Sequence, residues 1–155
     1  MPKVRPATEE DLEYLSTRLR PEDITEIYAM DGSTPAKALA ESFAHSTLCK
    51  VMVTNDDEPF AIYGVGPLDT PIGPFESGAG VSWMLGTEKL ASNSMWFLRN
   101  CHWMLDEMHE HFPTFGNLAD ERNTVHIQWL KWAGFEFGRR IPWGGTHFLE
   151  HWRTK

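Results

Sequence analysis

Apolar residues recur along the chain at two spacings, and these spacings separate the predicted helices from the predicted strands. The first helical pattern follows Thr8, which can cap a first turn made of three acidic residues. A proline in the first turn predicts the next two helices, at residues 21–30 and from residue 33 or 34 to 43. The longest pattern, at residues 92–112, is apolar around much of its circumference, so we expect neighbouring elements to cover this helix widely.

Strands are predicted where apolar residues alternate with polar ones or form short buried runs. After a short extended start at residues 4–5, they are expected at residues 49–54, 59–65, 80–85, 115–119, 135–141 and 146–152. Polar and glycine-rich turns join the first and last pairs as hairpins, and a segment rich in glycine and proline, residues 68–80, is expected to be an exposed loop. This order predicts an α/β fold with one mixed sheet in a single domain, residues 1–155.

Composition and charge exclude several classes of function. The net charge of −8 disfavours binding to nucleic acid or to an anionic membrane surface, and no apolar run approaches the ~18 residues that span a bilayer. Cys49 and Cys101 lack metal-type spacing, so free thiols in a reducing cytoplasm are favoured over a disulfide. The seven histidines form no metal-ligand motif, and no metal site is expected.

The most specific pattern lies at residues 120–135. Asn123 is placed to cap a helix with its side chain, Gly134 suits the left-handed position after the last turn, and Phe135 returns the chain to the core. A well-capped core helix would have the same features. The Asn123…Gly134-Phe135 segment, with the element order, also resembles the GNAT superfamily of N-acyltransferases. That resemblance implies a twisted mixed sheet flanked by helices and splayed between its fourth and fifth strands, where acetyl-CoA or CoA would bind.

A narrower resemblance is carried by residues 4–15, 83–87 and 122–126. These segments are similar to a GNAT-like family of short-tailed phages that includes an internal virion protein. The resemblance implies a protein that acts in the cytoplasm of an infected bacterial host.

The superfamily resemblance also implies site residues. The implied cofactor contacts are Met84, Leu85, Gly86, Ser92, Asn93, Ser94 and Asn123, and the catalytic candidates are His126, Asp120 and Glu121. The sequence differs from the superfamily pattern at two places, and both differences argue against these roles. Residues 86–94 hold one glycine where a glycine-rich phosphate turn would lie. Leu130 occupies the position where many of these enzymes place a tyrosine acid, and leucine cannot transfer a proton. His126, one turn earlier, could replace it, or could pack or cap near the helix start.

Seven tryptophans support a rival hypothesis. Trp96 and Trp103 share a face of the long helix, and Trp129 and Trp132 share a face of the next. Tryptophan is seldom fully buried, and exposed aromatic residues anchor protein partners. The sequence therefore favours a catalytically silent GNAT-like protein that binds a host or phage protein during infection or virion assembly. An active acetyl-CoA-dependent N-acetyltransferase is the alternative, and the oligomeric state has no signature in the sequence.

Overall fold

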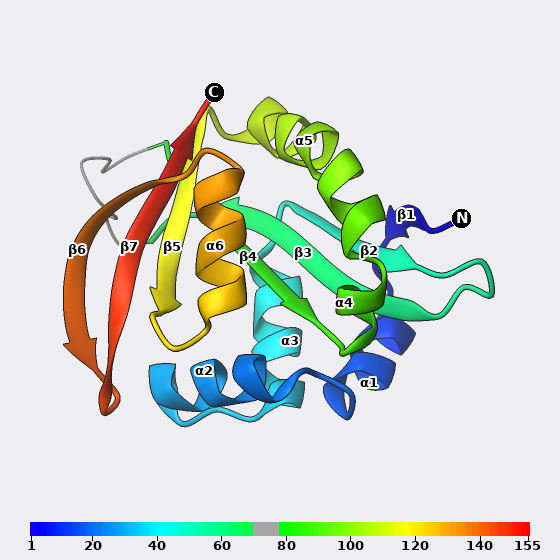
Figure 1. The fold of residues 1–155 in the computed structure, drawn as a ribbon, viewed down its shortest axis with the longest axis horizontal. Coiled ribbons are helices and arrows are strands. Elements are labelled where there is room, and N and C mark those ends of the chain that lie inside the picture. The colour runs from blue at the N-terminus through cyan, green and yellow to red at the C-terminus, as the bar shows by residue number, and fades with distance from the viewer. Residues whose placement is uncertain (70–77) are drawn as a thin grey trace.

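The computed structural model describes residues 1–69 and 78–155, in which the strands form one mixed sheet (Figure 1). Its seven described strands follow the order β1-β2-β3-β4-β5-β7-β6. Their bounds are β1 (Lys3–Pro6), β2 (Leu48–Val53), β3 (Pro59–Pro67), β4 (Gly80–Gly86), β5 (Thr114–Asp120), β6 (Glu136–Trp143) and β7 (Thr146–Thr154). All neighbouring pairs are antiparallel except β4 and β5, which are parallel. The predicted α/β class and mixed sheet are confirmed.

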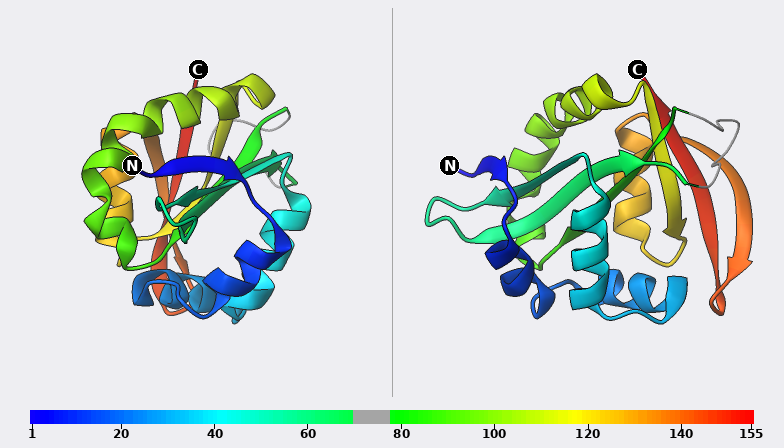
Figure 2. Two further views of the ribbon diagram at one scale, coloured as in Figure 1. Left: turned by 90° about the vertical axis from the view of Figure 1, so that its right-hand side faces the viewer. Right: turned by 180° about the vertical axis from the view of Figure 1, so that it is seen from behind.

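Helices cover both faces of this sheet (Figure 2). One face carries α1 (Glu9–Ser16), α2 (Pro21–Asp31) and α3 (Pro35–His45), and the other carries α4 (Lys89–Ser92), α5 (Ser94–His111) and α6 (Thr124–Trp132). Each face therefore has its own hydrophobic core, and the larger one lies beneath α5 and α6. Among the described helices, none has the length and apolar character to cross a membrane.

Local signals explain several boundaries. Thr8 and Asp11 form the reciprocal capping box that the sequence predicted for α1. Gly134 adopts φ 91° just after α6, and Phe135 is buried, as expected. The predicted helix at residues 92–112 is confirmed as α5 to within two residues at each end, but the short helix α4 that precedes it was not predicted. Within the predicted loop at 68–80, residues 70–77 lie outside the described part of the chain.

The sheet opens at its centre. β4 and β5 pair only at Gly80 with Phe115 and at Val81 with Gly116, and Figure 1 shows the two strands pointing apart beyond that point. β5 meanwhile stays paired with β7 along its full length. The predicted splay between the fourth and fifth strands is therefore confirmed, and it leaves a gap, here called the fork, between residues 82–86 and residues 117–120.

Candidate functional site

The fork leaves two strand edges without a neighbouring strand. In the β3–β4 pair the Thr87 N–H donates to the Phe60 carbonyl at 3.0 Å. Bonded and non-bonded pairs alternate along an antiparallel ladder, so the backbone groups of Ser82, Met84 and Gly86 point away from β3 and into the fork. This edge is the surface on which an extended ligand could form backbone hydrogen bonds.

Most of these edge groups already have partners within the protein. The Ser82 carbonyl accepts from Asn117 Nδ2 at 2.8 Å, so an amide side chain replaces the ladder where strand pairing ends. The Gly86 N–H donates to Asp23 Oδ2 at 2.9 Å, and the Gly86 carbonyl accepts from the Arg20 N–H at 2.9 Å. Met84 lies between these two occupied positions, and its N–H and C=O face the fork.

Two carboxylates from α2 close the open end of the fork. Asp23 is 1% exposed and also accepts from Arg20 Nη2 at 2.8 Å and from Asn123 Nδ2 at 3.1 Å. Glu26, three residues later on the same face of the helix, accepts the Asp120 N–H of β5 through Oε1 at 2.8 Å. One helix therefore caps an unpaired N–H on each diverging strand, which satisfies buried donors that would otherwise cost roughly 1–3 kcal/mol each.

Glu26 is an acidic group at the fork whose pKa lies near neutral pH. Burial raises its pKa from the ordinary 4.5 to about 7, and the negative charges of Asp23 and Asp120 act in the same direction. Hydrogen bonds from the Asp120 N–H and from Asn123 oppose this rise without cancelling it. A carboxylate that titrates near neutral pH is suited to accept a proton at physiological pH. The sequence did not predict a role for Glu26, although its spacing from Asp23 places both carboxylates on one face of the helix.

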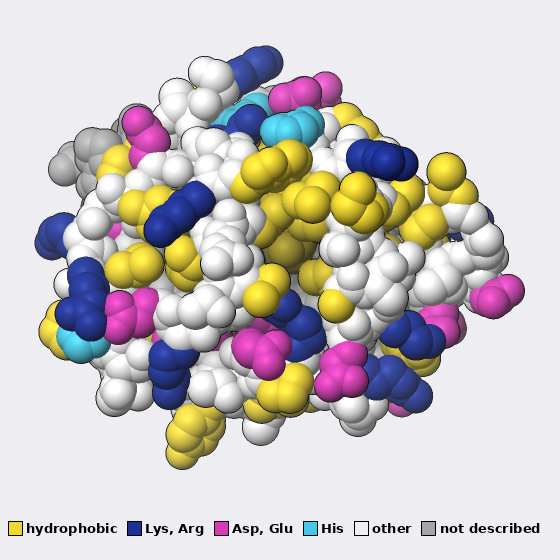
Figure 3. Space-filling model, viewed as in Figure 1, with side chains coloured by type: hydrophobic (Ala, Val, Ile, Leu, Met, Phe, Trp, Pro, Cys, Tyr) yellow, Lys and Arg dark blue, Asp and Glu magenta, His cyan; other side chains and the backbone are white. Residues whose placement is uncertain are grey.

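Three hollows meet at the fork. The outer groove, of about 420 Å³, lies between the start of α5 and α6; its wall is mostly apolar and includes Leu90, Phe97 and Trp129 (Figure 3). The acidic pocket, of about 290 Å³, lies on the opposite face beside α2 and α3, where Glu26, Asp31 and Glu41 line it. The inner cavity, of about 40 Å³, extends into the larger core.

Met84 and His126 line all three of these hollows. They therefore mark the point where a molecule in the outer groove and a molecule in the acidic pocket would touch. Burial lowers the pKa of His126 to about 4, and the nearby Arg20 adds to this against the opposing charge of Asp23. The imidazole is thus neutral at pH 7, which argues against the predicted use of His126 as a general acid in place of the missing tyrosine.

The two acidic candidates are held in ion pairs. Burial alone would raise the pKa of Asp120, but hydrogen bonds from Arg122 and Thr146 outweigh it and hold the pKa below its ordinary value. Glu121 pairs with Arg140 at 2.8 Å, and this contact also lowers its pKa. Both carboxylates remain ionised and engaged, so Glu26 is the better proton acceptor at this site.

The predicted cofactor residues separate into two groups. Met84, Leu85 and Ser94 line the hollows, and Ser94 lies at the rim of the outer groove. The side chains of Ser92 and Asn93 both donate to the Lys89 carbonyl, at 3.1 and 2.9 Å, and neither residue lines one of the three hollows.

Asn123 and Gly86 are engaged inside the protein. The prediction that the Asn123 side chain caps α6 is wrong, because its amide reaches across to Asp23 and makes no capping bond. The Gly86 backbone is likewise bonded to Asp23 and Arg20, as described above. Leu130, in the expected tyrosine position, faces the inner cavity. Among the described residues, no group of three or more His, Cys, Asp or Glu is placed to hold a metal ion.

Comparison with known proteins identifies the architecture. No family model and no curated protein sequence matches the chain. Solved structures match it over nearly its whole length. A GCN5-related N-acetyltransferase from Kribbella flavida has a TM-score of 0.72 at 19% identity, with 99% of this chain and 98% of that chain covered.

Some of the matching structures contain coenzyme A or its acetyl form. AAC(6')-Ib, in complex with ribostamycin and coenzyme A, has a TM-score of 0.71 at 15% identity, with 99% and 93% covered. A GNAT superfamily phosphinothricin acetyltransferase from Sinorhizobium meliloti, in complex with AcCoA, has a TM-score of 0.67 at 12% identity, with 99% and 88% covered. At these identities the likeness shows the fold alone, and the fold is the GNAT fold.

Proposed function

We propose that the protein is an N-acyltransferase that takes an acyl group from acyl-CoA and transfers it to a cationic amine. The observation that carries this proposal is the meeting of the three hollows at Met84 and His126, with Glu26 in the wall of the acidic pocket. A donor and an acceptor that enter from opposite faces of the sheet would come together there, and such positioning alone can lower a barrier by several kcal/mol.

The residues around the outer groove fit a coenzyme A arm. The backbone groups of Met84 face the fork and can bind amides of an extended arm as a neighbouring strand would. The groove wall is largely apolar, and Arg20 contributes a cation to it. At its rim, Ser94 begins α5, whose uncharged first turn presents the positive end of the helix dipole to phosphate groups.

Bound acyl-CoA would supply a thioester carbonyl. The carboxylates of the acidic pocket attract a positively charged amine, and Glu26 can remove the proton that keeps the amine from reacting. The neutral amine then attacks the thioester carbonyl, a carbon–nitrogen bond forms and the carbon–sulfur bond breaks, so coenzyme A leaves as a thiolate. Glu26 holds the first proton of the amine, and the second, which the nitrogen loses as the amide forms, passes to solvent or to the thiolate. A thiol has a pKa of roughly 8.5, and its thiolate therefore leaves readily even though Leu130 offers no proton.

Calorimetric titration with acetyl-CoA and CoA tests the proposal without knowledge of the acceptor. We expect saturable binding, and we expect Ser94→Glu to weaken it at least tenfold, because the new charge repels phosphate while it favours the start of α5. Ala36→Glu is the matched control, since it places the same charge in the exposed first turn of α3, on the other face of the sheet. Absence of heat and of any thermal stabilisation at millimolar acetyl-CoA would overturn the proposal.

An exposed apolar surface supports the second candidate, a silent protein-binding role. Trp132, at the mouth of the outer groove, is 51% exposed, and Trp103 and Met95 on α5 are also exposed. Exposed tryptophan favours contact with a protein. A stoichiometric complex from a lysate that survives Ser94→Glu but not Trp132→Ala would support this role. The partner, a host or phage protein, and the phage origin stay predictions.

A further inference from the structure

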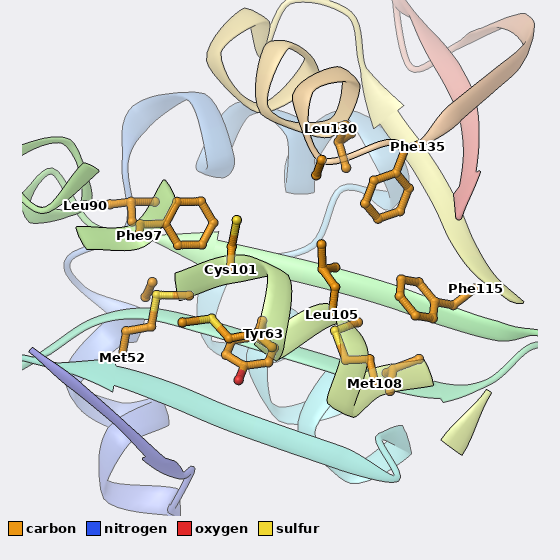
Figure 4. Close-up of a cluster of buried hydrophobic side chains, with 14 of the residues drawn as sticks. Met52, Tyr63, Leu90, Phe97, Cys101, Leu105, Met108, Phe115, Leu130 and Phe135 are labelled. Atoms are coloured by element: carbon orange, nitrogen blue, oxygen red, sulfur yellow. The ribbon is translucent and has the colours of Figure 1, made fainter. Parts of the chain in front are cut away.

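The inner cavity lies in the larger hydrophobic core, directly beneath the fork. Cys101 and Leu105 point into this part of the core from α5, and Leu130 and Phe135 face them from the opposite side (Figure 4). The rest of its wall is also mainly apolar, with Met84, Met104 and Met108 among the lining residues. A mainly apolar wall of this kind favours contact with apolar groups.

This cavity adjoins the proposed reaction centre. Its wall shares Met84 and His126 with both the outer groove and the acidic pocket. Phe97 and Trp129 also line both the cavity and the outer groove. A chain attached to a carbonyl group at Met84 would therefore enter the inner cavity while the amine approaches from the acidic pocket.

The cavity is larger than an acetyl group requires. Its volume of about 40 Å³ has room for roughly three water-sized groups, whereas the acetyl group has one methyl beyond its carbonyl. Methionine side chains are flexible and fill irregular gaps, so the three methionines can adjust around a short chain. The place that a tyrosine would fill in many GNAT enzymes is taken by Leu130, whose apolar side chain completes this wall.

From these observations we infer that the preferred donor carries a short acyl chain of three or four carbons in total rather than acetyl. The inference rests on the proposed function, since it assigns the acyl end of the same donor. Each methylene that is buried against the apolar wall of the cavity should tighten binding about fourfold. The gain should stop at butyryl, whose three carbons beyond the carbonyl fill the available room.

A calorimetric series with CoA, acetyl-, propionyl-, butyryl- and octanoyl-CoA tests this inference on the unaltered protein. We expect Kd to fall about fourfold from acetyl to propionyl and again to butyryl, with octanoyl binding no more tightly than butyryl. Equal or weaker binding of butyryl-CoA relative to acetyl-CoA would overturn the inference while the proposed function stands. Continued tightening to octanoyl would overturn the size limit. Absence of binding by all five compounds would instead reject the proposed function and the inference with it.

A variant that fills the cavity gives a second measurement. Cys101 is buried in its wall, and Cys101→Leu should bring the Kd values of acetyl- and butyryl-CoA within twofold of each other. Val51→Leu is the control, because Val51 is equally buried but belongs to the core on the other face of the sheet. An unchanged preference for butyryl-CoA in folded Cys101→Leu would contradict the assignment of the chain to this cavity.

Discussion

Replacement of Glu26 by glutamine should make the protein more stable and less active at the same time. Glutamine keeps an oxygen that can accept the Asp120 N–H, and its amide hydrogens can donate to neighbouring carboxylates. It is neutral at every pH, whereas the native carboxyl must ionise next to Asp23 and Asp120. The substitution therefore removes the energetic penalty of a buried charge while it preserves the contact between α2 and β5.

The pKa of Glu26 determines the sign and the size of this change in stability. Because folding raises this pKa from 4.5 to about 7, the folded protein binds more protons than the unfolded chain between these values. The stability that this group contributes is fully present below pH 4.5 and is lost as the pH rises through 7. The difference in pKa corresponds to about 3 kcal/mol at pH 8. Glu26→Gln should recover most of that loss, an increase of roughly 6–12 °C in Tm.

Urea unfolding of both proteins from pH 4.5 to pH 8.5 measures this effect. The free energies of unfolding should coincide near pH 4.5, separate as the pH rises toward 7 and differ by a constant amount above that, with the variant more stable. Glu22→Gln, an exposed change on the same helix, should follow the native curve. A difference between native protein and Glu26→Gln that does not depend on pH would refute the argument. Once an amine acceptor is found, the variant should also lose roughly 10²–10⁴ in rate, which a purely structural carboxylate would not explain.

Two further substitutions test how the fork is built. Asp23→Ala leaves the half-buried Arg20 charge and the Gly86 and Asn123 donors without their acceptor, and should lower the free energy of unfolding by about 3–5 kcal/mol in urea titration. A loss no larger than that of exposed Glu22→Ala would contradict the network. Gly116→Ala places a Cβ against the His151 carbonyl of the paired β7 backbone, which cannot move aside, and should cost more than about 3 kcal/mol by thermal unfolding. In Gly86→Ala the tightest contact of the new Cβ is with the flexible end of Leu90, and its other contacts are at ordinary distance. This substitution should cost clearly less, so a reversed order would contradict this reading.

The parts of the structure that local patterns control could be predicted from the sequence. The capping box of Thr8, the left-handed Gly134 and the type of nearly every element follow from interactions among residues a few positions apart. The short helix α4 could not be predicted, because its four residues are too few to show an apolar period. The GNAT resemblance also located the splay correctly, since that feature belongs to the order of the elements.

The site itself depends on contacts that no local pattern contains. Asp23 meets Asn123 across 100 positions, and Glu26 meets Asp120 across 94. In the sequence, Asp23 resembles any acidic residue in the first turn of a helix, and Asn123 resembles an ordinary N-terminal helix cap. Their roles appear only when the topology brings α2 to the ends of β4 and β5, where unpaired backbone donors require acceptors.

This arrangement links the stability of the fork to its chemistry. Two strands that diverge inside a sheet leave N–H groups that would otherwise favour closure of the gap, and carboxylates on α2 remove that tendency by binding one N–H on each strand. Asp23 serves this purpose as a charge, because Arg20 and two further donors compensate it. Glu26 has fewer donors and two negative neighbours, so its ionisation works against the fold. The same imbalance raises the pKa of Glu26 to about 7. The carboxyl that binds the Asp120 N–H of β5 can therefore also exchange a proton where the three hollows meet.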